Sequence, residues 1–169
     1  EKKLPPVVID ADGLYHLSNI QDWQNMVKAD LVLTPHPGEM AVLTGLNVQE
    51  IQKDRVGVAR KFACEWRQTV VLKGALSVVA DPTGKTAVIP IACSGLAKAG
   101  SGDVLAGMIG GLIAQGLDPW QAAVTGAWLH ASAGFVASEI TGCPEAVLAG
   151  DVISAVPKVY QQLRANDLP

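Results

Sequence analysis

Short apolar runs and amphipathic segments alternate along the chain, and this pattern predicts an α/β fold. Continuous runs of branched apolar residues, typical of buried strands, occupy residues 7–9, 31–33 and 70–72. Between residues 54 and 68 an apolar side chain recurs every three or four positions, which predicts an amphipathic helix. Its apolar face comprises Val56, Ala59, Ala63 and Trp66. Strands that alternate with helices favour a mostly parallel sheet with helices on both faces.

A strand hairpin and three helices are predicted after the third apolar run. Residues 76–80 and 86–89 flank a turn that contains proline and glycine, which predicts an antiparallel pair of strands at the edge of the sheet. The turn at 100–103 opens a helix with almost no polar face, which we expect to be buried on nearly all sides. Two later helices are expected to start at Pro119, after an Asp cap, and at Asp151.

Polar turns follow each of the three predicted parallel strands. They span residues 10–12, 34–39 and 73–77. Right-handed crossovers bring the carboxyl ends of parallel strands to one edge of a sheet, and ligands of such folds bind outside that edge. The sequence therefore predicts that these turns meet and form the functional site.

Composition narrows the class of partner. The chain has 169 residues, which fits one domain, and 49% of them are hydrophobic. Thirteen Lys and Arg against 16 Asp and Glu give a net charge of -3 without a basic block, so the sequence does not have the charge of a nucleic-acid-binding protein. The longest apolar run, residues 104–114, is well short of the ~20 residues that span a bilayer. We expect a small-molecule partner.

Cysteine usage bears on the cellular location of the protein, and the start of the chain bears on whether the sequence is a fragment. The three cysteines have neither CxxC pairing nor zinc-ligand spacing, so a reducing, cytoplasmic location is expected. The chain opens at Glu1 without methionine or a signal-peptide pattern. The apolar run at 7–9 has no earlier element to cover it. We therefore expect a fragment, which by itself is inactive.

The turn Gly100-Ser101-Gly102-Asp103 carries the strongest local chemical signal. Two glycines let backbone N–H groups approach a ligand, and the following helix directs its positive end at the same point, which predicts an anion site. The alternative is a tight turn in which Asp103 only stabilises the helix start. The turn has neither the lysine of a P-loop nor the glycine spacing of a dinucleotide fingerprint.

Three further side chains at the predicted edge are candidates, each with a structural alternative. His36 lies between two prolines, which hold its imidazole rigidly, although a loop histidine is often simply solvated. Glu39 is a candidate for binding a metal through water, or favours a helix dipole. Lys73 ends a buried strand, where its ammonium either reaches phosphates or remains solvated.

Four segments together resemble one family. They are DADGL at 10–14, LTPHPGEM at 33–40, VVLKG at 70–74 and AGSGDVLAGMIGGLIAQGLDP at 99–119. In this order they resemble the carbohydrate-kinase-like, ADP- or ATP-dependent NAD(P)H-hydrate dehydratases of the ribokinase superfamily. The resemblance covers residues 7–163. It implies that residues 1–169 are the carboxyl-terminal portion of one ribokinase-like domain, a three-layer α/β/α sandwich whose amino-terminal part is absent.

The resemblance implies a role for each candidate residue. His36 and Asp103 would contact the hydrated nicotinamide nucleotide, and Asp103 would be the catalytic residue. Glu39 would bind Mg²⁺ through water. The adenine-nucleotide site would comprise Lys73, Gly74, Ala75, Leu76, Ser77, Gly100 and Gly102.

The implied reaction repairs a damaged cofactor. The S-form of the hydrate of NADH or NADPH (NADHX or NADPHX) would lose water while ADP or ATP is consumed. The family also suggests a homo-oligomer, with a complementary amino-terminal fragment or an epimerase domain as a further partner. Two alternatives stay open: a small-molecule kinase acting on a carbohydrate or a hydroxymethylpyrimidine-like alcohol, which the same Asp and anion site would serve, and a non-catalytic nucleotide-binding fragment.

Overall fold

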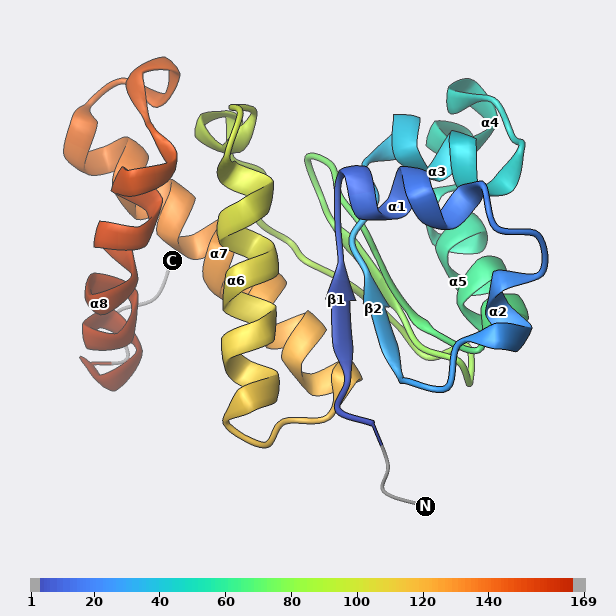
Figure 1. The fold of residues 1–169 in the computed structure, drawn as a ribbon. Coiled ribbons are helices and arrows are strands. Elements are labelled where there is room, and N and C mark those ends of the chain that lie inside the picture. Colours follow the sequence, from blue (N-terminus) through green and yellow to red (C-terminus); the bar gives the residue numbers. More distant parts are fainter. Residues whose placement is uncertain (1–3, 166–169) are drawn as a thin grey trace.

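Five strands form one mixed sheet in the computed structural model, which describes residues 4–165 (Figure 1). In spatial order they are β1 (Val7–Ile9), β2 (Leu31–Leu33), β3 (Thr69–Leu72), β4 (Val78–Ala80) and β5 (Thr86–Val88). The first three strands are parallel, and β4 is antiparallel to both of its neighbours, β3 and β5. Of the described strands only β4 therefore runs against the rest. The predicted mostly parallel sheet and its antiparallel edge pair are confirmed.

One face of the sheet is covered by the helices of the first half of the chain. These are α1 (Asp12–Ser18), α2 (Trp23–Met26), α3 (Pro37–Thr44), α4 (Val48–Lys53) and α5 (Arg55–Trp66). Their core contains three aromatic rings in tilted contact: the ring centroid of Trp66 lies 5.5 Å from that of Trp23 and 5.0 Å from that of Phe62. This layer holds the turns after β1 and β2 in place.

The opposite face is covered by the long helices of the second half. They are α6 (Ser101–Ala114), α7 (Pro119–Thr141) and α8 (Ala149–Ala165); the 3₁₀ turn η1 (Ser94–Leu96) precedes α6, and η2 (Pro144–Ala146) lies between α7 and α8. Helices α6 and α7 pack on the sheet, and α8 packs on α7 through a separate apolar cluster (Figure 1). The result is the predicted three-layer α/β/α sandwich.

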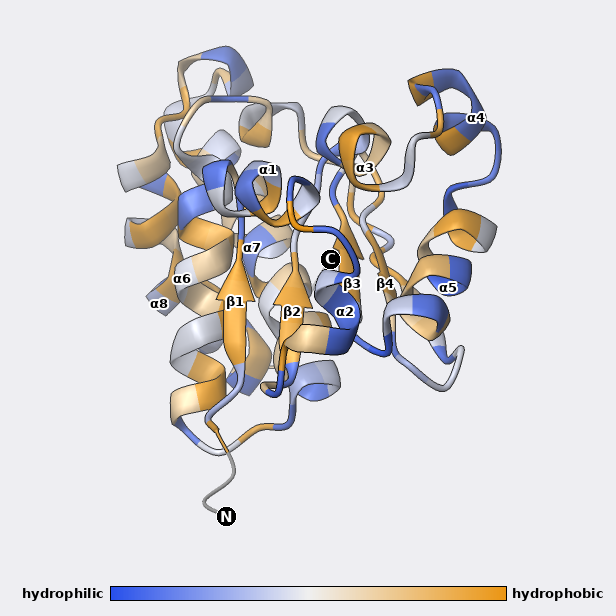
Figure 2. Ribbon diagram, turned by 45° about the vertical axis from the view of Figure 1, so that its right-hand side comes forward, coloured by the Kyte–Doolittle hydropathy of each residue, from blue (hydrophilic) through white to orange (hydrophobic). Residues whose placement is uncertain are grey.

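Alternating side chains of the strands enter the two layers, which explains why the strands are apolar throughout. On β2, Leu31 and Leu33 face the core formed with α5, while Val32 between them faces α6 and α7. All three are buried. Strands β1 and β2 in Figure 2 are accordingly hydrophobic along their length, as expected for a sheet covered on both faces.

Three expectations about helices need correction. In α5, Val56 is 38% exposed and Phe62 is buried in its place, because the helix rotates its aromatic side towards Trp23. Helix α6 is not buried on nearly all sides: Leu105 and Ile109 are buried, but a Cβ built at Gly107 would meet nothing within 4 Å. Its glycines contribute no apolar side chain that needs to be buried, so the helix can have few polar residues and still be partly exposed.

The third correction concerns the start of α8. The helix begins at Ala149, two residues before Asp151. The carboxylate of Asp151 instead accepts a hydrogen bond from the N–H of Leu148 at 2.8 Å, so it caps the helix from inside the first turn.

Two general features of the described residues complete the description. None of their helices combines the length and the apolar character that a membrane crossing requires. The cysteines at 64, 93 and 143 are free thiols.

Candidate functional site

The turns after the three parallel strands are joined through their backbones. The N–H of Thr34, after β2, donates to the carbonyl of Ile9 at 3.2 Å. The N–H of Lys73, after β3, donates to the carbonyl of Pro35 at 2.8 Å. The prediction that these turns meet at one edge of the sheet is confirmed.

A charged cluster occupies the centre of this edge. The ammonium Nζ of Lys73 lies 2.6 Å from Oδ1 of Asp10 and 3.6 Å from Oε2 of Glu39. These three side chains are only 19%, 11% and 19% exposed, respectively. Lys73 is therefore neither solvated nor unpaired, and the cluster carries two carboxylates for one ammonium.

Sequence reasoning noticed the turn that contains Asp10 but did not name Asp10 as a site residue. The sequence did contain a signal for Asp10, because a carboxylate directly follows a predicted buried strand. The contact with Lys73 joins residues 63 positions apart, so the pairing itself is visible only in the fold.

A strained backbone shapes the turn next to Asp10. Ala11 has φ of 48° and ψ of -123°, a conformation that favours glycine. Such a residue costs about 1–3 kcal/mol and persists where the surrounding structure holds it. The turn redirects the chain from β1 into α1 and leaves the Asp10 carboxylate beside Lys73.

His36 is the N-cap of α3. Its Nδ1 accepts hydrogen bonds from the N–H groups of Gly38 at 2.9 Å and Glu39 at 3.2 Å. In return, Oε2 of Glu39 accepts from the N–H of His36 at 2.7 Å, which completes a capping box. With Nδ1 acting as an acceptor, a neutral imidazole carries its proton on Nε2, which lies 3.4 Å from Oε1 of Glu39. His36 thus has a fixed orientation, and more than half of its side chain stays exposed.

Two groups of free backbone donors lie on either side of Lys73. Within residues 4–165, the N–H groups of Gly74, Ala75 and Leu76 donate no hydrogen bond. The same holds for the N–H groups of Gly102 and Asp103 in the first turn of α6. Free N–H groups at a helix start and in a turn, together with an ammonium, are the donors that anion-binding sites use, so this arrangement is a candidate anion site.

Gly102 lies directly against the charged cluster. A Cβ built at this position would be 3.3 Å from Oδ2 of Asp10 and 3.4 Å from Nζ of Lys73. A larger side chain would therefore crowd both. The absence of a side chain keeps the ammonium and the start of α6 next to each other.

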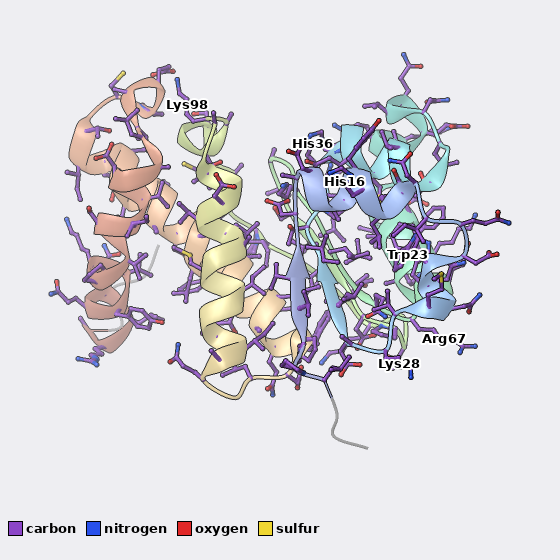
Figure 3. All side chains as sticks on the ribbon, viewed as in Figure 1. His16, Trp23, Lys28, His36, Arg67 and Lys98 are labelled. Atoms are coloured by element: carbon purple, nitrogen blue, oxygen red, sulfur yellow. The ribbon has the colours of Figure 1, made fainter. Side chains whose placement is uncertain are left out.

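A cavity of about 810 Å³ opens beside this anion site. One wall is apolar and comprises Ile89, Ile91, Leu105, Ala127 and Ala131. His36 and Lys98 also line the cavity, and Figure 3 places both at the end of the molecule where α6 begins and the parallel strands end. An apolar wall next to an anion site suits a ligand with a flat base and a phosphate chain.

Most of the predicted site residues line this cavity. They are His36, Lys73, Gly74, Ala75, Ser77 and Gly102. Leu76 is exposed beside them, and Gly100 takes the left-handed conformation, with φ of 85°, that starts α6. Asp103 is exposed in the first turn of α6 without lining the cavity. Glu39 lines a second, smaller pocket of about 170 Å³ between α1 and α3, together with Tyr15 and Val42.

His130 and Cys93, which are not among the candidates from the sequence, also line the cavity. His130 is only 8% exposed, and its Nε2 has no hydrogen-bond partner within the described residues. Burial lowers the pKa of His130 to about 4; the Ser101 backbone opposes this shift and the charge of Lys73 adds to it. The imidazole is therefore neutral near pH 7. Because His130 is a single histidine on an apolar helix, the sequence did not indicate that it lines a cavity.

The layer order is that of the ribokinase-like fold. A ribokinase-like superfamily protein of Enterococcus faecalis superposes with a TM-score of 0.73 at 22% identity, covering 96% of this chain and 54% of that protein. The model of the NAD(P)H-hydrate dehydratase family matches residues 1–158, and the chain belongs to this family.

Individual relatives agree with this assignment. The chain is 46% identical over 158 residues to a bifunctional NAD(P)H-hydrate repair enzyme of Moorella thermoacetica, covering 94% of the chain and 30% of the relative. It is 45% identical over 152 residues to an ADP-dependent (S)-NAD(P)H-hydrate dehydratase of Neisseria meningitidis, covering 89% and 51%. The crystal structure of an ADP/ATP-dependent NAD(P)H-hydrate dehydratase from Bacillus subtilis, co-crystallised with ATP and Mg²⁺, superposes with a TM-score of 0.82 at 32% identity, covering 93% and 55%. The chain thus spans about half of these relatives' length or less.

Proposed function

We propose that this chain carries the nucleotide-binding and catalytic edge of an ADP- or ATP-dependent dehydratase that converts the S-form of NADHX or NADPHX back to NADH or NADPH. One observation supports this most: Lys73 lies between two groups of free backbone donors at the mouth of the cavity. Membership of the dehydratase family supplies the reaction class.

The nucleotide would bind along the cavity. Its phosphates would accept hydrogen bonds from the 73–77 turn and from the first turn of α6, where Gly102 keeps a side chain away and Gly100 supplies the left-handed residue that starts the helix. Its base would lie on the apolar wall. The hydrated nicotinamide would lie at the opposite side of the anion site, within reach of His36 and Asp103. Nε2–H of His36, fixed by the capping box, is the donor available to it.

The chemistry follows from the poor leaving ability of hydroxide. Asp103 takes the proton of the substrate hydroxyl, whose oxygen then bonds to the terminal phosphorus of the nucleotide as the bond to the bridging oxygen breaks. The phosphate ester so formed leaves as inorganic phosphate when the ring nitrogen donates its electron pair, and loss of a ring proton restores the dihydronicotinamide. Lys73 and the free N–H groups stabilise the charge that develops on the transferred group.

The carboxylates of the site fit a role for Mg²⁺. Oxygen donors are the ligands that Mg²⁺ prefers, and it usually uses one or two carboxylates together with substrate phosphates and water. Asp10 and Glu39 supply two such groups beside Lys73. The described residues contain no cluster of three or more His, Cys, Asp or Glu side chains that would hold the ion without the nucleotide. A bound Mg²⁺ would supply positive charge to the phosphates.

The test is an assay on the full-length protein that separates dehydratase from kinase. Hydrated NADH is supplied with ADP or ATP and Mg²⁺, and both the dihydronicotinamide absorbance and inorganic phosphate are followed. Recovery of the absorbance with an equal amount of phosphate supports the proposal. Formation of a stable phosphate ester on a small alcohol, without recovery, would establish the kinase alternative.

The partners of the full-length protein belong to the same proposal. The Moorella relative is named as a bifunctional repair enzyme, which supports an epimerase activity as a partner of this one. Assembly into a homo-oligomer, a cytoplasmic location and the assignment of residues 1–169 to the carboxyl-terminal portion of one domain stay predictions.

A further inference from the structure

A single arginine lies beneath the 73–77 turn, on the side away from the cavity. Arg55 is the first residue of α5, and its guanidinium Nη2 donates to the carbonyl of Leu72 at 3.0 Å and to that of Leu76 at 3.3 Å. These carbonyls lie on either side of the turn's first residues. One side chain from a neighbouring layer thus ties the end of β3 to the far side of the turn.

The guanidinium also lies against the backbone of Gly74. A Cβ built at Gly74 would be 2.5 Å from Nη2 and 2.8 Å from both Cζ and Nη1 of Arg55. No side chain fits there without displacing the arginine. Glycine at this position is therefore explained by Arg55 rather than by a positive φ, since Gly74 is not among the residues in that conformation.

The arrangement suits arginine in particular. Nη1 of Arg55 donates to Oε1 of Gln52 at 2.9 Å, so three acceptors share one rigid, planar group. A lysine has a single nitrogen and cannot reproduce this geometry. Burial lowers the pKa of Arg55, but a guanidinium stays protonated in proteins.

Arg55 orients the turn without lining the cavity. With the carbonyls of Leu72 and Leu76 held towards α5, the N–H groups of residues 74–76 stay unpaired. Four other restraints act on the turn: the bond from the Lys73 N–H to Pro35, the ion pairs of the Lys73 ammonium, a 3.5 Å contact of Ser77 Oγ with the Gly74 carbonyl, and the start of the ladder at Ser77. Within the described residues, none of these four contacts holds the backbone of Ala75 or Leu76.

We propose that Arg55 is a positioning residue that holds residues 73–77 in the conformation that binds the nucleotide phosphates, without touching the ligand. The proposal rests on the nucleotide site proposed above. If Arg55 only stabilises the fold, its loss lowers the melting temperature and leaves the affinity of the folded protein for nucleotide unchanged.

The test compares Arg55→Met and Arg55→Lys with Arg60→Met, a matched change at an exposed position of the same helix. Calorimetry on the full-length protein, well below each melting temperature, measures ADP affinity, and ¹⁵N relaxation of the ligand-free protein measures the motion of the Gly74, Ala75 and Leu76 amides. Arg55→Met is expected to weaken ADP binding tenfold or more and to increase the amplitude of motion of these amides. Arg55→Lys should retain only part of the ADP affinity and of the rigidity of these amides. Arg60→Met should change neither the affinity nor the motion of the amides.

The outcomes separate the two proposals. If the wild-type protein does not bind ADP, the nucleotide site is wrong, and the relaxation data still show whether Arg55 holds the turn. If wild type and Arg55→Met bind ADP equally, or if the amides do not become more mobile, the positioning role is refuted.

A double variant tests the contact with Gly74 directly. Gly74→Ala alone must displace the guanidinium and should weaken ADP binding. In an Arg55→Ala background the three atoms nearest to the new Cβ are gone, so the additional effect of the same change should be several-fold smaller. Effects that simply multiply would show that the guanidinium does not lie against Gly74.

Discussion

Opposite effects on nucleotide affinity are expected from the two partners of the central ion pair. In the ligand-free protein, Asp10 holds Lys73 at 2.6 Å, so an incoming phosphate meets an ammonium that is already paired. A phosphate oxygen that accepts from Lys73 on its other side would lie about 5 Å from the Asp10 carboxylate. Two unit negative charges at that separation repel by about 3 kcal/mol at an effective dielectric constant of 20. Asp10→Asn removes this repulsion.

The expected magnitudes follow from these numbers. Without a divalent cation, Asp10→Asn should strengthen ADP binding by up to about a hundredfold, since each 1.36 kcal/mol is a factor of ten. Lys73→Met removes a charge-assisted hydrogen bond of about 1.5–3 kcal/mol and should weaken binding by about 10- to 150-fold. The low exposure of both side chains limits screening by solvent.

Calorimetric titration of the full-length protein with ADP in the presence of a chelator measures both effects. Lys158→Met, an exposed change on α8, is the control for loss of a lysine charge and should leave the affinity unchanged. Lys73→Met also leaves a largely buried Asp10 carboxylate without its partner, so the titrations are run well below the melting temperature of each variant. If Asp10→Asn weakens metal-free ADP binding, the Asp10 carboxylate does not compete with the nucleotide for Lys73, and the reasoning fails.

Three further outcomes are expected. Ala11→Gly should raise the free energy of unfolding by about 1 kcal/mol, because it relieves the positive φ at this position, and denaturant titration measures it. Asp103→Asn should lower turnover by about 10²–10⁴ while ADP still binds; near-normal turnover would return Asp103 to a helix-start role. The pKa of His130 is about 4 in the folded protein against 6.5 for the free side chain, so its stabilising contribution is complete above about pH 6.5 and is lost as the pH falls towards 4. Unfolding measured across that range should show a decline of stability that is smaller in His130→Gln.

The strands and the common edge could be predicted from the sequence because both follow from local pattern. Three apolar runs, each followed by a polar turn, are sufficient to predict parallel strands and a site at their ends. The environment of each site residue could not be predicted in this way. The sequence allowed Lys73 to be solvated, but it lies between Asp10 and Glu39, which come from turns after two other strands.

Helix α6 and Arg55 also show that the environment of a residue could not be predicted from the sequence alone. An apolar sequence predicted that α6 is buried on nearly all sides, but a stripe that contains Asp103 and Gly107 is exposed. On the packed side, Gly126 of α7 lets Ile109 approach so closely that a Cβ would lie 2.7 Å from its side chain. Arg55, by contrast, lay off the apolar face of its predicted helix and gave no sign of a role. Its partners, Leu72 and Leu76, are backbone carbonyls, for which no side-chain pattern exists.

The edge strand β1 has a consequence for how the isolated 169-residue chain behaves at high concentration. On the side away from β2, its backbone pairs with no strand within residues 4–165, and Val7 at its start is 41% exposed. Such an edge accepts any extended segment through main-chain hydrogen bonds, with little selection by side chain. Self-association of this isolated chain through strand addition should therefore increase with concentration and be insensitive to salt, and an upstream segment that pairs with β1 should suppress it. Light scattering across a dilution series would separate it from assembly through charged surfaces, which salt weakens.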